Sequence, residues 1–254
     1  MSPRDSSAIR AAVRHFWISR AGAGTKQLSS EMADRGERAN VTSGKHLDGF
    51  ADFITQLVEE TGVSKPAVKK KVQLTTLPGF FRPTKKWDII IHSEERLIAV
   101  VELKSHVGPS FGNNCNNRAE EALGNAVDFW TAHREGAFGK STRPFLGYLM
   151  LLEDCPAVHT KSDRLRPSYF DLLPEFRNAT YANRYRILCE KLMLESLYSS
   201  AAVILSPRSA INDGAFSEMS EGSGLETFLR ELRGKLFAQS GSDEQVTVRV
   251  REEP

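Results

Sequence analysis

The chain has 254 residues, 40% of them hydrophobic, so it can bury a sizeable core as one large domain or as one domain with an appendage. Lysine and arginine number 34 against 32 acidic residues, a net charge of +2, so composition excludes a strongly basic nucleic-acid-binding chain and any basic surface must come from local clustering. The N-terminal sequence MSPRDSSAIR has no apolar signal-peptide core and no later run approaches a membrane span, so we expect a soluble, cytoplasmic protein.

The three cysteines, Cys115, Cys155 and Cys189, are odd in number, lie far apart and lack CxxC spacing. This pattern argues against a disulfide framework and against a zinc site. We expect three reduced thiols with structural roles.

Hydrophobic spacing predicts two helices and a strand in the first third of the chain. Apolar residues recur at helical spacing over 8–18, and the sequence SRAGAGTK that follows is expected to end this helix. A second amphipathic helix is expected over 45–60, with Gly62 after it as a stop. The stretch 68–76 has little helical period and ends at the turn sequence LPGFFRP, which favours a strand.

The middle of the chain predicts a hairpin, a helix and a buried strand. Strands are expected over 87–91 and 97–105, joined by the charged turn HSEER. An ordered loop rich in Gly and Asn, 108–117, leads into a helix over 118–133, and the apolar run 145–152 is typical of a strand buried on both faces. A strand, a crossover helix and a buried strand imply a parallel pair.

The last third begins with a polar stretch that contains prolines. A long helix is expected over 181–198, a short strand over 201–205, a helix over 225–237 and a final strand in EQVTVRV. The order of elements predicts an α/β fold in which helices flank a central mixed β-sheet, with extra helices near the C-terminus.

The stretch KKWDIIIHSEERLIAVVELKSH carries the chemistry. Side chains alternate along a strand, so Glu102 and Lys104 point the same way, and Asp88 belongs to the neighbouring strand. Charges at the end of a buried strand are costly unless they pair or bind an ion. Two carboxylates and one ammonium match Mg²⁺, which takes a few carboxylate oxygens, keeps several waters and contacts substrate phosphate. Lys104 would orient or activate the attacking water and offset developing negative charge.

The hairpin geometry decides whether the two acids can act together. A two-residue turn at 94–95 would place Asp88 opposite Val101, pointing away from Glu102. We therefore expect a loop with an odd number of residues, most simply 94–96, or a bulge that brings the acids to one face.

An ExK tripeptide alone is weak support, because it occurs by chance in many proteins and usually forms a partly solvated ion pair. The context is more specific: an acid precedes ExK by one hairpin, apolar residues flank the ExK strand, and a helix precedes the strands. This arrangement resembles the PD-(D/E)xK nuclease core, with WD where the motif often has Pro-Asp.

Longer strings resemble one family within that superfamily. The segments ELKSHVGPSFGNNCNNRAEEALGNAVDFW, REGAF, FLGYLMLLEDCP and YANRYRILCEKL are similar to the XhoI family of type II restriction endonucleases, over most of the chain from about Ile18 onward. The resemblance implies a homodimer that cuts both strands of double-stranded DNA within the palindrome CTCGAG, using Mg²⁺. It also implies a cognate DNA methyltransferase as genetic partner.

The same resemblance implies a fold and a set of catalytic residues. The expected fold is a PD-(D/E)xK restriction-endonuclease-like core in a single nuclease domain, 1–254, with the core at about 45–155 and a C-terminal helical extension at about 175–254. The motif's acid, second acid and lysine fall at Asp88, Glu102 and Lys104.

Many nucleases of this superfamily take a further carboxylate for the metal from the first helix. Asp48, Asp52 and Glu59 lie along one flank of the helix expected over 45–60, and Asp48 is the preferred candidate. For each of the three, a solvated helix flank is the commoner role.

Candidate DNA-binding residues follow the catalytic strand, and they are Asn113, Asn114, Asn116 and Arg118. Asn can read adenine and Arg can read guanine through paired hydrogen bonds. Turn chemistry is the alternative, since Asn readily adopts the left-handed conformation and caps helices, and Asn117 is the expected helix cap. Three further cations, Arg82, Lys85 and Lys86, precede the first acid and are expected to hold phosphates beside the cut.

Two other functions remain open from the residues alone. One is a repair or recombination nuclease that reads DNA structure or ends, and the other is a catalytically silent DNA-binding module. The complete set of Asp88, Glu102 and Lys104 disfavours a silent module. A methyltransferase gene beside this one would favour the sequence-specific enzyme over the repair nuclease.

Overall fold

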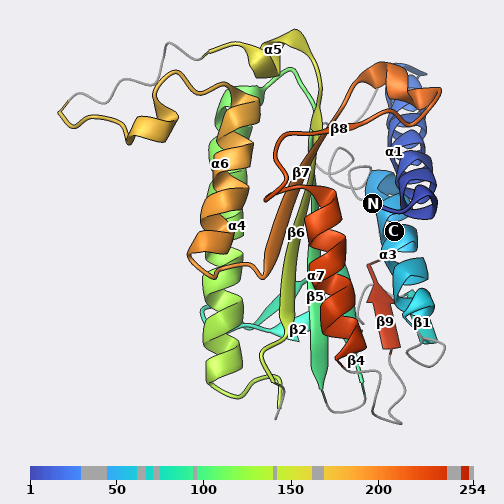
Figure 1. Cartoon of the computed structure of the whole chain (residues 1–254), viewed down its shortest axis with the longest axis vertical. Coiled ribbons are helices and arrows are strands. Elements are labelled where there is room, and N and C mark those ends of the chain that lie inside the picture. Colours follow the sequence, from blue (N-terminus) through green and yellow to red (C-terminus); the bar gives the residue numbers. More distant parts are fainter. Residues whose placement is uncertain are drawn as a thin grey trace.

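The computed structural model of the chain describes residues 1–29, 45–61, 67–70, 75–93, 96–139, 142–161, 169–238 and 247–251, with only the backbone described at 23–29, 67–70 and 113. A central β-sheet lies between two layers of helices (Figure 1). The helices, in chain order, are α1 (Pro3–Ser29), η1 (Lys45–Leu47), α3 (Asp48–Glu60), α4 (Phe111–Arg134), α5 (Pro156–His159), η3 (Pro174–Phe176), α6 (Tyr181–Leu194), η4 (Arg208–Ile211) and α7 (Leu225–Phe237).

The described strands form one large sheet and one small hairpin. In chain order they are β1 (Ala67–Lys70), β2 (Thr76–Pro78), β3 (Thr84–Lys86), β4 (Ile89–His92), β5 (Leu97–His106), β6 (Phe145–Glu153), β7 (Ser200–Ser206), β8 (Ser217–Glu218) and β9 (Thr247–Val250). The large sheet has the strand order β1-β9-β4-β5-β6-β7-β8, and β2 pairs only with β3. The predicted mixed α/β architecture is therefore confirmed.

The centre of the sheet is parallel, antiparallel pairs lie on both sides of it, and the edge strand β1 is parallel to β9. β5, β6 and β7 run parallel, whereas β4 is antiparallel to both β5 and β9. The parallel pairing of β5 with β6 across α4 confirms the predicted crossover. The final strand β9 was predicted, but not its place: it enters the sheet between β1 and β4.

Alternation along β5 separates two hydrophobic cores. Val101 and Leu103 pack with the layer of α1, α3 and α7. Val100 packs into the second core, which α4 and α6 cover. Because side chains alternate, Glu102 and Lys104 point to the same side as Val100.

Three predicted boundaries are wrong, and the smallest difference is that α6 ends at Leu194 and not at 198. Helix α1 continues through SRAGAGTK to Ser29, because a glycine inside a helix costs only about 1 kcal/mol and does not by itself end it. Helix α4 begins at Phe111, so the expected loop 108–117 is mostly helix and Asn117 is not its cap. The ring of Phe111 is buried beside His106, at 4.9 Å between ring centroids, and this packing anchors the first turn.

Other expectations hold. Helix α7 has the predicted bounds, and α3 with η1 covers the predicted second helix. All three cysteines are free thiols, as expected. In the part of the chain that the structure describes, none of the helices has the length and apolar character needed to cross a membrane.

Candidate active site

The hairpin of β4 and β5 brings the two predicted acids to one side of the sheet. Ile89 pairs with Val101, so Asp88, one residue earlier, is level with Glu102. Nearer the turn the register shifts by one residue, and the extra residue on β5 is Ile98. The sequence predicted either an odd loop, most simply at 94–96, or a bulge, and the structure has the bulge, so the prediction that the hairpin brings the two acids level is confirmed.

Asp88 lies immediately before β4 and is fixed from both neighbouring strands. Its Oδ2 accepts the backbone N–H of Leu103 at 2.7 Å, and its Oδ1 lies 3.5 Å from Nη1 of Arg251. The backbone N–H of Arg251 also donates to the carbonyl oxygen of Asp88 at 2.8 Å. Burial raises the pKa of Asp88, and the negative charge of Glu102 adds to this rise against the attraction of Lys104.

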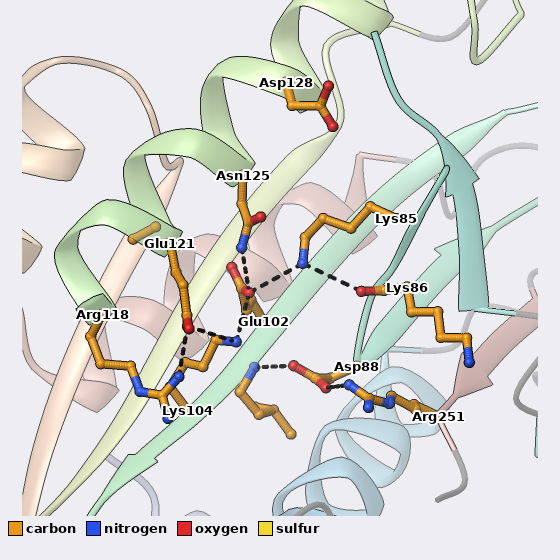
Figure 2. A network of polar contacts seen from close by, with 12 residues as sticks. Lys85, Lys86, Asp88, Glu102, Lys104, Arg118, Glu121, Asn125, Asp128 and Arg251 are labelled. Carbon is orange, nitrogen blue, oxygen red and sulfur yellow. Dashed lines mark hydrogen bonds and ion pairs between the residues drawn. The ribbon is translucent and has the colours of Figure 1, made fainter. Parts of the chain in front are cut away.

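Glu102 is a buried carboxylate with four side-chain partners, and Figure 2 shows Lys85, Lys104 and Asn125 among them. Its Oε1 lies 3.1 Å from Nζ of Lys104 and 3.4 Å from Nζ of Lys85, and it accepts Nδ2–H of Asn125 at 2.8 Å. The hydroxyl of Tyr198 donates to Oε2 at 2.9 Å. Burial alone would raise the pKa of Glu102, but the two lysines and the hydrogen bonds outweigh it and lower the pKa. The acid is therefore ionised at neutral pH.

Lys104 connects the buried acid to helix α4. Its ammonium lies 3.5 Å from Oε2 of Glu121, which also pairs with Arg118 at 2.6 Å (Figure 2). Burial lowers the pKa of Lys104, but the carboxylates of Glu102, Asp88 and Glu121 outweigh burial, so the pKa is raised overall. Lys104 therefore carries a positive charge at neutral pH.

This donor set fits a hard divalent cation. Asp88 and Glu102 offer carboxylate oxygens from adjacent strands, and the charge of Glu102 raises the pKa of Asp88. Mg²⁺ needs only one or two protein carboxylates, because waters and a substrate phosphate complete its shell. Among the described residues, no three His, Cys, Asp or Glu side chains form a metal-binding group. Asp48 does not join the pair in such a group, and its helix α3 packs on the opposite face of the sheet.

Asn125 and Tyr198 were not found from the sequence. Asn125 is buried on α4 among apolar residues. A polar residue on the apolar face of the helix is the signal that could have identified it. Tyr198 precedes β7 and is 96 residues from Glu102 in the chain, so nothing local indicated their contact.

The three cations predicted to hold phosphates have different surroundings. Lys85 reaches the buried acid, and burial lowers its pKa against the attraction of that carboxylate. Lys86 is exposed. Arg82 donates from Nε to Oδ2 of Asp128 and from Nη2 to Oδ1 of Asn125, both at 2.8 Å. Of these three cations, Lys85 and Arg82 are therefore engaged by buried acids, and Lys86 is exposed to solvent.

The candidate base-reading residues lie in the first turns of α4. Asn114 is exposed, and the exposed Asn116 accepts a hydrogen bond from Nη2 of Arg184 at 2.6 Å. Arg118 donates a hydrogen bond to Glu121, the acid on α4 that also contacts Lys104. The side chain of Asn113 lies outside the described part of the structure.

The chain is similar to known proteins over most of its length. The family model described as Restriction endonuclease XhoI matches residues 26–218. The chain is 47% identical over 212 residues to the type II restriction enzyme BstVI of Geobacillus stearothermophilus. The matched region covers 82% of this chain and 93% of the relative. It is 42% identical over 200 residues to the type II restriction enzyme XhoI of Xanthomonas vasicola, 78% of this chain and 79% of the relative. Identity to the type II restriction enzyme AbrI of Azospirillum brasilense is 47% over 160 residues, 63% of this chain and 72% of the relative. No solved structure matches.

Proposed function

Since the chain belongs to the XhoI family of restriction endonucleases and is a site-specific deoxyribonuclease, we propose that it cuts double-stranded DNA within CTCGAG by Mg²⁺-dependent hydrolysis. The observation that supports the chemistry is the convergence of Asp88, Glu102 and Lys104 on one face of two adjacent strands. We assign these residues to the PD-(D/E)xK motif as its first acid, second acid and lysine.

The proposed mechanism divides the work between the acids and the lysine. Asp88 and Glu102 would hold Mg²⁺, which when bound supplies stabilisation of charge on the phosphoryl oxygens. Lys104, whose ammonium lies 3.1 Å from Glu102, would orient the attacking water and offset the negative charge that develops on the phosphate. Hydrolysis forms a bond between the water oxygen and phosphorus and breaks one phosphorus–oxygen ester bond, and a proton from the water ends on the departing sugar oxygen, so one new end carries a phosphate and the other a hydroxyl.

The buried partners of Glu102 keep its carboxylate in place. Asn125 donates a hydrogen bond to Oε1 and Tyr198 donates one to Oε2, and together these bonds fix the carboxylate plane. A fixed carboxylate loses less freedom when it binds a cation. In this proposal Asn125 and Tyr198 are positioning residues.

Recognition of the palindrome is proposed to involve the start of α4. The exposed Asn114 and Asn116 can reach base edges, whereas Lys86 can reach a phosphate. A palindromic target mirrors a two-fold protein axis, so we propose that the enzyme acts as a homodimer in the cytoplasm, beside a cognate methyltransferase that protects the cell's DNA.

The test is digestion of a plasmid of known sequence with Mg²⁺, followed by mapping of the new ends. We expect every end to fall within CTCGAG and no cleavage when EDTA removes the metal. The matched control is Glu102→Gln, which keeps the shape of the side chain and removes its charge. Scattered ends, or degradation that starts only at free ends, would contradict the proposal and favour a repair nuclease.

A further inference from the structure

The turn between β2 and β3 exposes two adjacent aromatic rings. Phe80 is 50% exposed and Phe81 is 69% exposed. Their ring centroids lie 4.9 Å apart in an edge-to-face arrangement. Exposed large apolar groups that gather in one place often mark a binding surface. We call these two residues the aromatic tip.

The backbone of the aromatic tip is held in place by one buried acid on α4. Oδ1 of Asp128 accepts the backbone N–H of Phe80 at 2.9 Å and that of Phe81 at 2.8 Å. Oδ2 of the same acid pairs with Nε of Arg82 at 2.8 Å. Gly79 completes the tight turn, since a Cβ there would lie 2.5 Å from the carbonyl oxygen of Arg82. The rings are thus presented on a fixed backbone, which lowers the entropy cost of binding.

The aromatic tip is connected to the candidate active site by hydrogen bonds. Arg82 donates to Asn125, and Asn125 donates to Glu102, each at 2.8 Å. Figure 2 shows Asp128 and Asn125 on the same helix face, with the hairpin strand that carries Lys85 and Lys86 beside them. The tip and the catalytic acid therefore belong to one connected structure.

We propose that the aromatic tip packs into a groove of the duplex beside the scissile phosphate, an inference that rests on the proposed nuclease function. Proteins that place apolar side chains in DNA grooves combine them with cations on the bordering phosphates. Lys86 is exposed at the far end of the same hairpin. Four residues lie between Phe81 in the turn and Lys86 at the end of β3, so the apolar rings and the cation are carried by one short hairpin.

The local charge favours DNA over a protein partner. Arg82 neutralises Asp128, so the tip carries no free negative charge that would repel phosphate. Lys86, exposed on β3 of the same hairpin, is the positive charge that borders the tip. An apolar tip bordered by positive charge matches a polyanion with apolar base and sugar surfaces.

The experiment is a titration of a short duplex containing CTCGAG with the double variant Phe80→Ala and Phe81→Ala, in Ca²⁺ to suppress cleavage. We expect affinity to fall about tenfold or more, as for loss of an aromatic contact to a base. The slope of binding against salt should stay as in the wild type, because no charge is removed. Lys86→Gln provides the contrast, with a slope smaller by about one.

A second exposed aromatic pair provides the matched control. Tyr169 and Phe170 are 92% and 84% exposed, and the described segment 169–180, which contains η3, extends away from the sheet beyond α6 in Figure 1. Replacing both by alanine should change affinity by less than about twofold, on the scale of surface substitutions. An equal loss from this control would overturn the inference, because it would indicate general loss of apolar surface.

The outcomes separate the inference from the function on which it rests. A wild-type enzyme that neither binds nor cuts the duplex would remove the proposed function and the inference with it. A wild-type enzyme that cuts, together with a double variant of unchanged affinity, would overturn the inference alone. A double variant that sediments as a monomer where the wild type is a dimer would also overturn it, because the tip would then contact a second copy.

Discussion

Helices α7 and α4 pack on opposite faces of the sheet, and their buried residues differ in kind. The buried residues of α7 are all apolar: Leu225, Phe228, Leu229, Leu232 and Leu236. Helix α4 buries Asn125 and Asp128 among its apolar residues. Strand β5 presents side chains to both faces of the sheet. Val101 and Leu103 point toward the α7 face, and Glu102 and Lys104 point toward the α4 face. The comparison teaches that both faces bury a hydrophobic core, that the α7 face is the stabilising face alone, and that the α4 face also carries the candidate site, at a cost in polar burial.

The largest effect is expected from the apolar face. Phe228→Ala removes a fully buried ring that packs edge-to-face on Phe145, at 5.6 Å between centroids. The free energy of unfolding should fall by about 3 to 5 kcal/mol because a cavity remains. Thermal unfolding measures this loss, and cleavage assayed where the variant is still folded should match the wild type within about twofold. A folded variant that no longer cuts would break the division between the faces.

The next effect is expected on chemistry without loss of stability. Lys104→Ala should lower the cleavage rate by at least about a hundredfold, because the charged donor to the attacking water is gone. Sequence-specific binding in Ca²⁺ should survive. Lys85→Ala is the matched control, since both lysines lie within 3.4 Å of the same carboxylate oxygen, and we expect a loss of only about tenfold. Equal losses from the two lysines would refute a special role for Lys104.

A smaller effect is expected from the polar residue that positions the second acid. Asn125→Ala removes a donor to Glu102 and an acceptor of Arg82. The Mg²⁺ concentration for half-maximal cleavage should rise about tenfold or more, whereas the rate at saturating Mg²⁺ should fall less. Leu123→Ala, on the exposed side of the same helix, is the control and should leave both quantities unchanged. Asn125→Ala with unchanged Mg²⁺ dependence would mean that the residue only packs.

The smallest effect concerns an acid of the stabilising face. Arg233 hydrogen-bonds Asp5 and, against the effect of burial, lowers the pKa of Asp5 from 3.8. A lowered folded-state pKa contributes stability above the unfolded pKa, and this contribution is lost as pH falls through the folded pKa. Asp5→Asn should therefore unfold about 1 kcal/mol more easily at pH 7, and at acid pH the difference from wild type should shrink as pH falls below 3.8 through the lowered folded-state pKa. Urea unfolding at both pH values measures it, and a difference independent of pH would contradict the assignment to this charge.

Local pattern was enough to predict the elements whose burial repeats regularly. Helix α7 and strand β6 were predictable because their apolar residues recur at a single period. The bulge at Ile98 was predictable because a strand repeats every two residues, so two acids on one face require an extra residue somewhere in the hairpin.

Contacts between distant segments were not predictable. Phe111 extends α4 backward because His106 and Tyr181 surround its ring, which the Gly- and Asn-rich sequence after it does not indicate. Asn125 and Tyr198 meet Glu102 only through the packing of α4 and the segment after α6 on β5. Strand β9 shows period-two alternation, but alternation does not specify a partner strand.

A ribosome makes Asp88 long before it makes β9. The two are separated by about 160 residues, which at about 5 to 20 residues per second is a delay of roughly ten to thirty seconds. Until then β4 lacks its β9 neighbour, and Asp88 lacks both contacts from Arg251. Asp88 therefore reaches its final surroundings only after residue 251 has been synthesised, so products of interrupted translation that stop earlier lack the contacts that hold this candidate acid.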